Sequence, residues 1–317
     1  MTDPTASTVI GIDVGGTKVL GLAFDPTEPG TVLAESRLDT PHGTDHLMAT
    51  LLETVRRLDQ PPAAPVGLGI AGLVGRDGRF LVGPNVPGVI DAPLGAMLTE
   101  ELDGPVAVVN DASAAAWGEF KVGAGQGSSD FVMVTLGTGI GGGFIFDGQL
   151  FTGARGYAAE IGHMVVDPEG LECPCGRLGC WERYASGVGL GRMARARALD
   201  GGVAAAVELA GGDPHDVKGE HVTTAAAAGD DEALAVLDGF SEWLALGLAN
   251  LVAILDPDRI VLGGGVISSH DLFVEPTQRH VDRVLMEAEH RPAVPIVAAA
   301  LGPEAGAVGA GLFAAEI

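Results

Sequence analysis

The chain has 317 residues, 47% of them hydrophobic and 19% charged, which suits one large or two medium globular domains. Its 18 Lys and Arg stand against 42 Asp and Glu, so the formal net charge is −24 and the surface repels nucleic-acid phosphates. The apolar runs are interrupted before the ~20 residues that a membrane span needs, and residues 1–8 lack the features of a signal peptide. We therefore expect a cytoplasmic protein without nucleic-acid or membrane partners.

The first half of the chain predicts two similar β-hairpins with α/β elements between them. Residues 9–24 and 131–146 each contain two apolar strands joined by a turn of glycine and threonine. Between these hairpins we expect a helix over 46–58, a proline-rich break over 60–65, strands over 66–72 and 105–110, and a helix over 112–121. The repeated hairpin predicts two related α/β halves.

The second half predicts mostly helices, with two further strands. Helical composition and spacing run over 187–210 and 223–253, with a break at 211–214; a strand over 259–262, a helix over 268–289, a strand over 294–299 and a last helix over 304–315 follow. The mixture predicts an α/β fold. We expect a small N-terminal domain over 1–112, onto which the C-terminal helix, 304–317, packs back, and a larger domain with residues 113–303.

The only three cysteines of the chain lie close together, ten residues after a histidine. Three thiolates and one imidazole complete a tetrahedral Cys₃His set, and a closed set of four ligands is typical of structural zinc. The predicted ligands are His163, Cys173, Cys175 and Cys180. The alternatives are three buried core cysteines, whose positions would be scattered, or a disulfide, which would leave one thiol unpaired.

Three glycine-rich turns follow apolar strands and expose backbone N–H groups that can bind phosphate oxygens. They contain Gly15, Gly16, Thr17 and Lys18; Gly137, Thr138 and Gly139; and Gly263, Gly264 and Gly265. The first two lead from strand to strand, which excludes a Walker A loop or a Rossmann fingerprint. A single glycine turn commonly serves only backbone conformation, but three together predict a nucleotide site. Lys18 either contacts a phosphate or is simply solvated.

Two aspartates are candidates for the chemistry. Asp13 lies in the first hairpin, where its carboxylate would repel phosphates unless a cation such as Mg²⁺ lies between them; the alternative is an ordinary turn aspartate. Asp111 follows the strand over 105–110, at the end where open α/β sheets bind ligands, and is the candidate general base. Glu160 and Glu182 flank the cysteine cluster and suit recognition better than proton transfer.

These segments together resemble the ROK family of sugar kinases and sugar-responsive repressors. The residues that carry the resemblance are 13–18, 110–111, 137–143, 160–163 and 173–180, and it extends from Val9 to the last helix. The bacterial ATP-dependent glucokinases of the family look most similar. The resemblance implies two ribonuclease-H-like domains of the actin/hexokinase-like kind, around a central cleft that holds sugar and ATP.

The resemblance also implies residue roles. Asp111 becomes the catalytic base, the three glycine turns surround the nucleotide, and the sugar hydroxyls are bound by Asn85, Asn110, Asp111, Glu160, His163 and Glu182. The implied cofactors are ATP, Mg²⁺ and structural Zn²⁺, and the implied assembly is a homodimer or homotetramer. The family's repressors carry an N-terminal helix-turn-helix domain, and only eight residues precede the first strand here, so we expect no DNA binding of that kind.

The expected activity is ATP-dependent phosphorylation of glucose to glucose 6-phosphate. The aromatic residue found near Val89 in many relatives is missing, which leaves open another hexose or an N-acylated amino sugar such as N-acetylmannosamine. A sugar sensor without catalysis is the alternative from a different class. We further hypothesise that His163 uses one ring nitrogen for zinc and the other, as N–H, for a sugar hydroxyl.

Overall fold

The computed structural model describes residues 8–317, without the side chain of Ser268, and divides into two compact units. The first unit takes the chain up to Met133 and then Gly143–Ala159 and Ala300–Ile317. The second takes Val134–Gly142 and Glu160–Ala299. The chain thus returns to the first unit for its last helix.

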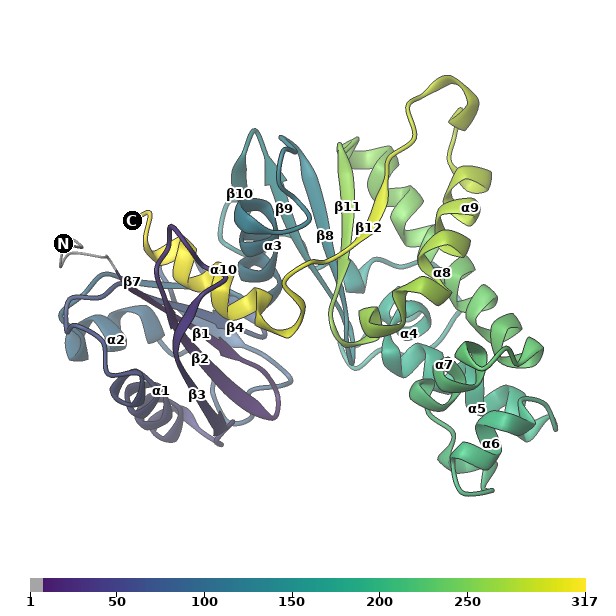
Figure 1. Cartoon of the computed structure of the whole chain (residues 1–317), viewed down its shortest axis with the longest axis horizontal. Coiled ribbons are helices and arrows are strands. Elements are labelled where there is room, and N and C mark those ends of the chain that lie inside the picture. Colours follow the sequence, from purple (N-terminus) through teal and green to yellow (C-terminus); the bar gives the residue numbers. More distant parts are fainter. Residues whose placement is uncertain (1–7) are drawn as a thin grey trace. The chain divides into compact units, whose positions relative to one another are not determined.

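A five-stranded sheet with the order β3-β2-β1-β4-β7 forms the framework of the first unit (Figure 1). Its strands are β1 (Val9–Val14), β2 (Lys18–Phe24), β3 (Val32–Asp39), β4 (Val66–Ile70) and β7 (Val106–Asn110). β1 and β2 pair antiparallel along their whole length, as the first predicted hairpin requires, whereas β1, β4 and β7 run parallel. The carboxyl ends of these three strands therefore meet at one edge, which carries Asp13, Ile70 and Asn110.

A second five-stranded sheet repeats this arrangement, in the order β10-β9-β8-β11-β12. Its strands are β8 (Phe131–Leu136), β9 (Ile140–Phe146), β10 (Gln149–Phe151), β11 (Arg259–Gly263) and β12 (Ile296–Ala298). In each sheet the first strand of the hairpin, β1 or β8, has its hairpin partner, β2 or β9, on one side. On its other side it has a strand from later in the chain, β4 or β11. This repetition agrees with the prediction of two related halves, and the α/β class is confirmed. A small additional sheet pairs β5 (Leu73–Val74) with β6 (Phe80–Val82).

Helices cover both sheets. The chain forms α1 (Thr44–Leu58), α2 (Leu94–Glu101), α3 (Asp111–Val122), α4 (Glu182–Ala185), α5 (Gly187–Leu199), α6 (Ala204–Leu209), α7 (Gly219–Ala227), α8 (Asp231–Leu255), α9 (Val274–Val284) and α10 (Ala305–Ala314), with 3₁₀ turns that include η1 (Ile161–His163), η3 (Gly265–Leu272) and η5 (Gly302–Glu304). The single helices predicted over 187–210 and 223–253 are each interrupted. Gly229, at a φ of +89°, ends α7, and the Asp230 carboxylate caps α8 by accepting the N–H of Ala233 at 2.8 Å.

Helix α8 is the central helix of the second unit. Leu237, Phe240, Leu244 and Leu248 recur on one face at helical spacing and are fully buried. By length and composition alone α8 is apolar enough to cross a membrane, but Asp238, Glu242 and Gly247 interrupt it and 56% of its most apolar stretch is buried inside the protein. Its contacts with α5, α7 and α9 explain its apolarity as that of a core helix.

Helix α10 lies directly against the backbone of the first sheet (Figure 1). A Cβ atom on Gly67 of β4 would collide with the Ala310 carbonyl oxygen, and one on Gly11 of β1 would collide with the Ala307 carbonyl oxygen. Glycine at these positions removes the atoms that would otherwise hold the elements apart. The helix therefore packs closely on β1, β4 and α3 through small residues.

A fully buried carboxylate holds α3 to the segment that leads into α10. Oε1 of Glu119 accepts the N–H of Leu301 at 2.7 Å, and Oε2 accepts the N–H groups of Ala124 at 2.7 Å and Ala300 at 3.0 Å. A buried charge is tolerated only when it is well paired, and three backbone donors satisfy this one. Glu119 thereby fixes the position at which the chain enters η5 and α10.

The close approach of α10 makes a specific stability prediction. Gly67→Ala should lower the free energy of unfolding by about 3 kcal/mol, because the new methyl group must displace the α10 backbone. Urea unfolding followed by circular dichroism measures the change. Gly30→Ala is the control, since a Cβ there meets no atom within 4 Å. Equal midpoints for the two variants would contradict this account of the interface.

Candidate functional site

The predicted site residues fall into two groups, one in each unit. The first unit holds Asp13, Gly15, Gly16, Thr17, Lys18, Asn85, Asn110 and Asp111. The second holds Gly137, Thr138, Gly139, Glu160, His163, Cys173, Cys175, Cys180, Glu182, Gly263, Gly264 and Gly265. Each group is assembled from elements that are distant in the sequence.

Two aspartates form the centre of the group in the first unit. Asp13 lies near the end of β1 and Asp111 begins α3, and both are half-buried. Glycines provide the space: a Cβ on Gly69 would lie 3.6 Å from Asp111 Cα, and one on Gly306 would lie 2.9 Å from Asp13 Cγ. Burial raises the pKa of Asp13 to about 7; the charge of Asp111 also raises it, and that of Lys18 lowers it. A cation beside Asp13 would relieve this repulsion.

Asn110 positions Asp111 at the helix start. Its side-chain oxygen accepts the N–H of Ser113 at 3.1 Å and so caps α3, while its amide nitrogen donates to the Gly72 carbonyl at 3.1 Å. Burial raises the pKa of Asp111, whereas hydrogen bonds from backbone N–H groups and from Asn110 act to lower it. Because a carboxylate with a raised pKa is a stronger base, Asp111 is suited to accept a proton.

The first glycine turn is held from the side by a neighbouring loop. The Gly15 N–H donates to the Lys18 carbonyl at 3.0 Å, and the Thr40 hydroxyl donates to the Gly15 carbonyl at 2.6 Å. The Gly15 N–H is thus used within the turn, and the exposed part of the turn begins at Gly16. A Cβ on Gly16 would lie 3.3 Å from Asn85 Cβ, so the structure brings Asn85 beside this turn.

The second and third glycine turns lie together in the second unit. The Gly187 N–H donates to the Gly137 carbonyl at 2.8 Å, which ties the start of α5 to the second turn. A Cβ on Gly264 would lie 2.6 Å from the Leu136 carbonyl oxygen, so the third turn packs against the end of β8. Strand ends and one helix start therefore converge around Gly137.

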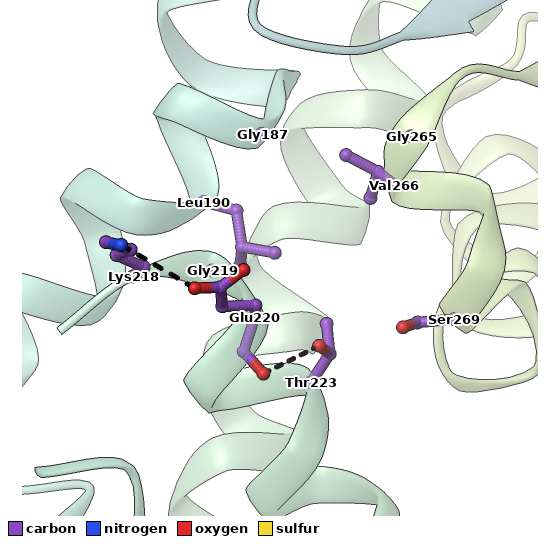
Figure 2. Close-up of a pocket in the computed structure, with 9 residues that line it drawn as sticks. All are labelled: Gly187, Leu190, Lys218, Gly219, Glu220, Thr223, Gly265, Val266 and Ser269. Atoms are coloured by element: carbon purple, nitrogen blue, oxygen red, sulfur yellow. Dashed lines mark hydrogen bonds and ion pairs between the residues drawn. The ribbon is translucent and has the colours of Figure 1, made fainter. Parts of the chain in front are cut away.

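A pocket of about 290 Å³ lies next to these turns (Figure 2). It is lined by Gly187, Leu190, Lys218, Gly219, Glu220, Thr223, Gly265, Val266 and Ser269. The Lys218 ammonium lies 3.7 Å from the Glu220 carboxylate, and the Thr223 hydroxyl donates to the Glu220 carbonyl at 3.1 Å. Among the lining residues, only Gly265 was predicted from the sequence. The others come from α5, the start of α7 and η3 and share no local motif, so no sequence signal identifies them.

The four predicted metal ligands form a compact cluster. One donor atom from each of His163, Cys173, Cys175 and Cys180 lies within 4.8 Å of all the others. The Sγ atoms of Cys175 and Cys180 are 3.5 Å apart, and Cys173 Sγ is 3.8 Å from His163 Nδ1. Tetrahedral zinc bonds of 2.0 to 2.3 Å place ligand atoms roughly 3.3 to 3.8 Å apart, so this donor set fits zinc. All three thiols are free, which argues against the disulfide alternative.

The two ring nitrogens of His163 face different neighbours. Nδ1 faces Cys173 and lies 3.7 Å from Oε1 of Glu182, whereas Nε2 lies 4.0 Å from Oε2 of Glu160. Glu160 immediately precedes η1, and residues three apart in a 3₁₀ turn lie over one another. The imidazole can therefore bind a metal through Nδ1 and leave Nε2 for a ligand.

Aromatic residues anchor the cysteine cluster to α8. Trp181 is fully buried and donates its indole N–H to the Trp243 carbonyl at 2.9 Å. The Tyr184 ring stacks on the Trp243 ring, with centroids 4.2 Å apart. A Cβ on Gly247 would collide with the Trp181 indole, so α8 approaches the cluster closely at this glycine. Cys173 and Cys180 are thus buried beside the core of the second unit, whereas Cys175 is exposed.

Comparison with known proteins places these features in a family. The ROK family matches residues 9–317. The glucokinase of Streptomyces coelicolor is 38% identical over 312 residues, which cover 97% of both chains. The N-acetylmannosamine kinase of Shigella flexneri is 33% identical over 305 residues, which cover 93% of this chain and 97% of that one.

A solved structure gives the same result for the fold. The ROK family glucokinase from Streptomyces griseus, in complex with glucose and AMPPNP, superposes with a TM-score of 0.87 at 37% identity. The match covers 98% of this chain and 100% of that chain. The expected actin/hexokinase-like fold is confirmed.

The raised pKa of Asp13 predicts how stability depends on pH. Between about pH 4 and pH 7 the folded protein retains a proton on Asp13 that the unfolded chain releases, so the stability should fall as the pH rises through this window. Asp13→Asn removes this loss of stability. In the absence of magnesium and nucleotide, the difference in free energy of unfolding between Asp13→Asn and wild type should therefore grow in favour of the variant up to pH 7, by at most roughly 4 kcal/mol.

Urea unfolding at several pH values measures this advantage. Asp25→Asn is the control, because hydrogen bonds from Thr27 lower the pKa of Asp25 instead of raising it. An Asp13→Asn advantage that stays constant from pH 4 to pH 8 would contradict the prediction.

Proposed function

The chain belongs to the ROK family, and from this premise we propose that it transfers the γ-phosphoryl group of ATP to glucose, which yields glucose 6-phosphate and ADP. The observation that carries the proposal is the pair of half-buried aspartates at the carboxyl ends of β1 and β7, in a chain similar over its whole length to glucokinases. Phosphoryl transfer needs a base for the attacking hydroxyl and a cation beside the phosphates. Asp111 and Asp13 are suited to these two tasks.

Asp111 would act as the general base. Its carboxylate accepts the proton of the sugar hydroxyl as that oxygen forms a bond to the γ-phosphorus and the bond to the departing ADP oxygen breaks. Burial raises its pKa towards the working pH, and the Asn110 cap holds the helix start that carries it. The side chain is thus a stronger base than an exposed aspartate and is held in one position.

The sugar hydroxyls would be bound by the predicted polar groups Asn85, Asn110, Asp111, Glu160, His163 and Glu182. Support for His163 comes from its orientation, which leaves Nε2 on the side away from the cysteines. Support for Asn85 comes from its position beside the first glycine turn. A pyranose presents several hydroxyls that both donate and accept, so a set of carboxylates, amides and one imidazole suits it.

The glycine turns and the pocket beside them would bind ATP. The exposed turn at Gly16–Lys18 and the partly exposed turn at Gly137–Gly139 suit phosphate oxygens, and Gly263–Gly265 leads to the pocket, whose Leu190 and Val266 suit the flat apolar faces of adenine. Lys18, which is exposed and acts on Asp13, would contact a phosphate. Asp13 would hold Mg²⁺ directly or through water, and the ion would neutralise charge on the phosphates.

The Cys₃His cluster would hold structural zinc through His163, Cys173, Cys175 and Cys180. The set leaves no open coordination position, so zinc would supply rigidity rather than a reacting water. Metal on Nδ1 of His163 fixes the proton on Nε2, which can then donate to a sugar hydroxyl. Zinc would thus shape the sugar site, and Asp111 would carry out the proton transfer.

A second candidate substrate is an N-acylated amino sugar. The relative from Shigella flexneri, named N-acetylmannosamine kinase, covers nearly the whole chain at 33% identity. The same carboxylates, amides and imidazole could bind the ring hydroxyls of such a sugar. The choice between glucose and an N-acylated amino sugar therefore depends on which substituent the site accepts at the second carbon of the ring.

We also propose that the protein works in the cytoplasm as a homodimer or homotetramer, with sugar and ATP as its small-molecule partners. The net charge of −24 makes association with nucleic acid or an anionic membrane unfavourable. Light scattering coupled to size exclusion would give the assembly size.

The proposed base makes a kinetic prediction. Asp111→Asn should lower kcat by roughly 10²- to 10⁴-fold, while the sugar Kd changes little, because the amide retains most contacts but cannot accept the proton. Stopped-assay kinetics and calorimetric sugar titration measure the two quantities. Asp45→Asn is the matched control, since Asp45 also lies in the first turn of a helix of the first unit. Unimpaired turnover by Asp111→Asn would mean that another group is the base.

A panel of sugars and phosphoryl donors tests the activity itself. We expect ADP release to be fastest with ATP and glucose, and slower with mannose, N-acetylglucosamine and N-acetylmannosamine. Polyphosphate replaces ATP in a parallel series in which glucose 6-phosphate is measured. Faster turnover of N-acetylmannosamine would favour the second candidate, and failure to release ADP with every sugar would favour a sensor without catalysis.

A further inference from the structure

The carboxylate of Glu182 contacts both the cysteine cluster and the second glycine turn. Its Oε1 accepts a hydrogen bond from Cys173 Sγ at 3.1 Å and lies 3.7 Å from His163 Nδ1. Its Oε2 lies so close to Gly139 that a Cβ there would collide with it, and no other residue outside the turn would lie within 4 Å of that Cβ. One side chain therefore links two sites that the proposed function treats separately.

The backbone that follows Glu182 contacts the other end of the same turn. Glu182 begins α4 two residues after the ligand Cys180, and Ser186 caps α5 by accepting the Gly189 N–H at 3.1 Å. The next residue, Gly187, donates to the Gly137 carbonyl at 2.8 Å and also lines the pocket. The segment over 182–187 thus holds the turn at Gly137 through a backbone hydrogen bond and packs the Glu182 carboxylate against Gly139.

We propose that Glu182 is a positioning residue through which metal in the Cys₃His cluster increases the affinity of the Gly137–Gly139 turn for nucleotide. A bound metal would take the Cys173 proton and fix Cys173, Cys180 and His163; Glu182, which begins α4 two residues after Cys180, is then fixed with them through the backbone. Without metal these ligands are free to move, and the turn must then be ordered when the nucleotide binds, which weakens binding. The inference rests on the proposed function, because it takes this turn to bind phosphates.

Coupling of this kind is reciprocal. If metal strengthens nucleotide binding, bound nucleotide must strengthen metal binding by the same factor. The structure also predicts that the coupling passes through the contact between Glu182 and Gly139. Glu160, which faces the other ring nitrogen of His163 and does not approach Gly139, should not transmit it.

The first experiment measures MgADP binding without sugar, by calorimetry, to the zinc-loaded protein and to protein freed of zinc by a chelator. We expect the Kd to be about tenfold higher without zinc and to recover when zinc is restored. Equal Kd values in the two states would overturn the coupling but leave the proposed function intact. Absence of MgADP binding in both states would instead contradict the proposed function.

Two glycine variants test the contact from the side of the turn. Gly139→Ala should push Glu182 away, release zinc to a chromogenic chelator several-fold faster than wild type and lose the protection that MgADP gives. Gly137→Ala is the matched control in the same turn, because a Cβ there meets no atom within 4 Å, and it should release zinc at the wild-type rate. Equal zinc release from the two variants would overturn the proposal.

Two carboxylate variants separate positioning from a general effect on folding. In Glu182→Ala the MgADP Kd should be the same with and without zinc, whereas Glu160→Ala should keep the tenfold difference. Both side chains neighbour His163, so both variants remove a carboxylate from the same imidazole. Persistence of the zinc effect in Glu182→Ala would show that another contact carries it and would overturn the role given to Glu182.

Discussion

The direct contact between the backbone of α10 and the first sheet is the constraint on which the first unit depends. Gly11 and Gly67 allow the helix to lie against β1 and β4, and the buried carboxylate of Glu119 ties its approach to α3. The same closeness brings Gly306 against Asp13. Small residues at an interface usually contribute little hydrophobic burial, but here Gly306 determines how closely α10 can approach the Asp13 carboxyl group. The packing of α10 on the sheet therefore also determines the geometry around Asp13.

In the second unit the corresponding feature is the Cys₃His cluster, whose donor atoms could hold a metal ion. Its helices form a core around α8, and Trp181 anchors the cysteine segment to that core. From there Glu182 and Gly187 reach the glycine turn at Gly137–Gly139. A closed set of four ligands would add no reactive water, so a bound metal would contribute position rather than chemistry. The proposed chemistry is assigned to Asp111, and we propose that the cluster governs how rigidly the turn at Gly137–Gly139 is held.

Features that depend on neighbours in the sequence were predictable. The first hairpin pairs as its alternation of apolar strands and glycine turn predicts, and the cysteine ligands converge because residues 173–180 form one tight turn. The break over 211–214 was predicted, but those within 187–210 and 223–253 were missed; in the second, the alanine-rich composition continues up to Gly229, where the backbone conformation ends α7. Helical propensity predicts that a helix is present more reliably than it predicts the residue at which the helix ends.

The sequence by itself determined the α/β class, the repeated hairpins, the cluster of residues that could hold a metal and the candidacy of Asp111, because each is recorded in residues close along the chain. Only the tertiary structure decided that Asn110 caps the helix of Asp111, that Gly306 packs on Asp13, and that Glu182 contacts Gly139. It also assembled the pocket, whose lining spans 187–269. Such contacts join residues far apart in sequence, and their positions follow from the packing of whole elements rather than from any local pattern.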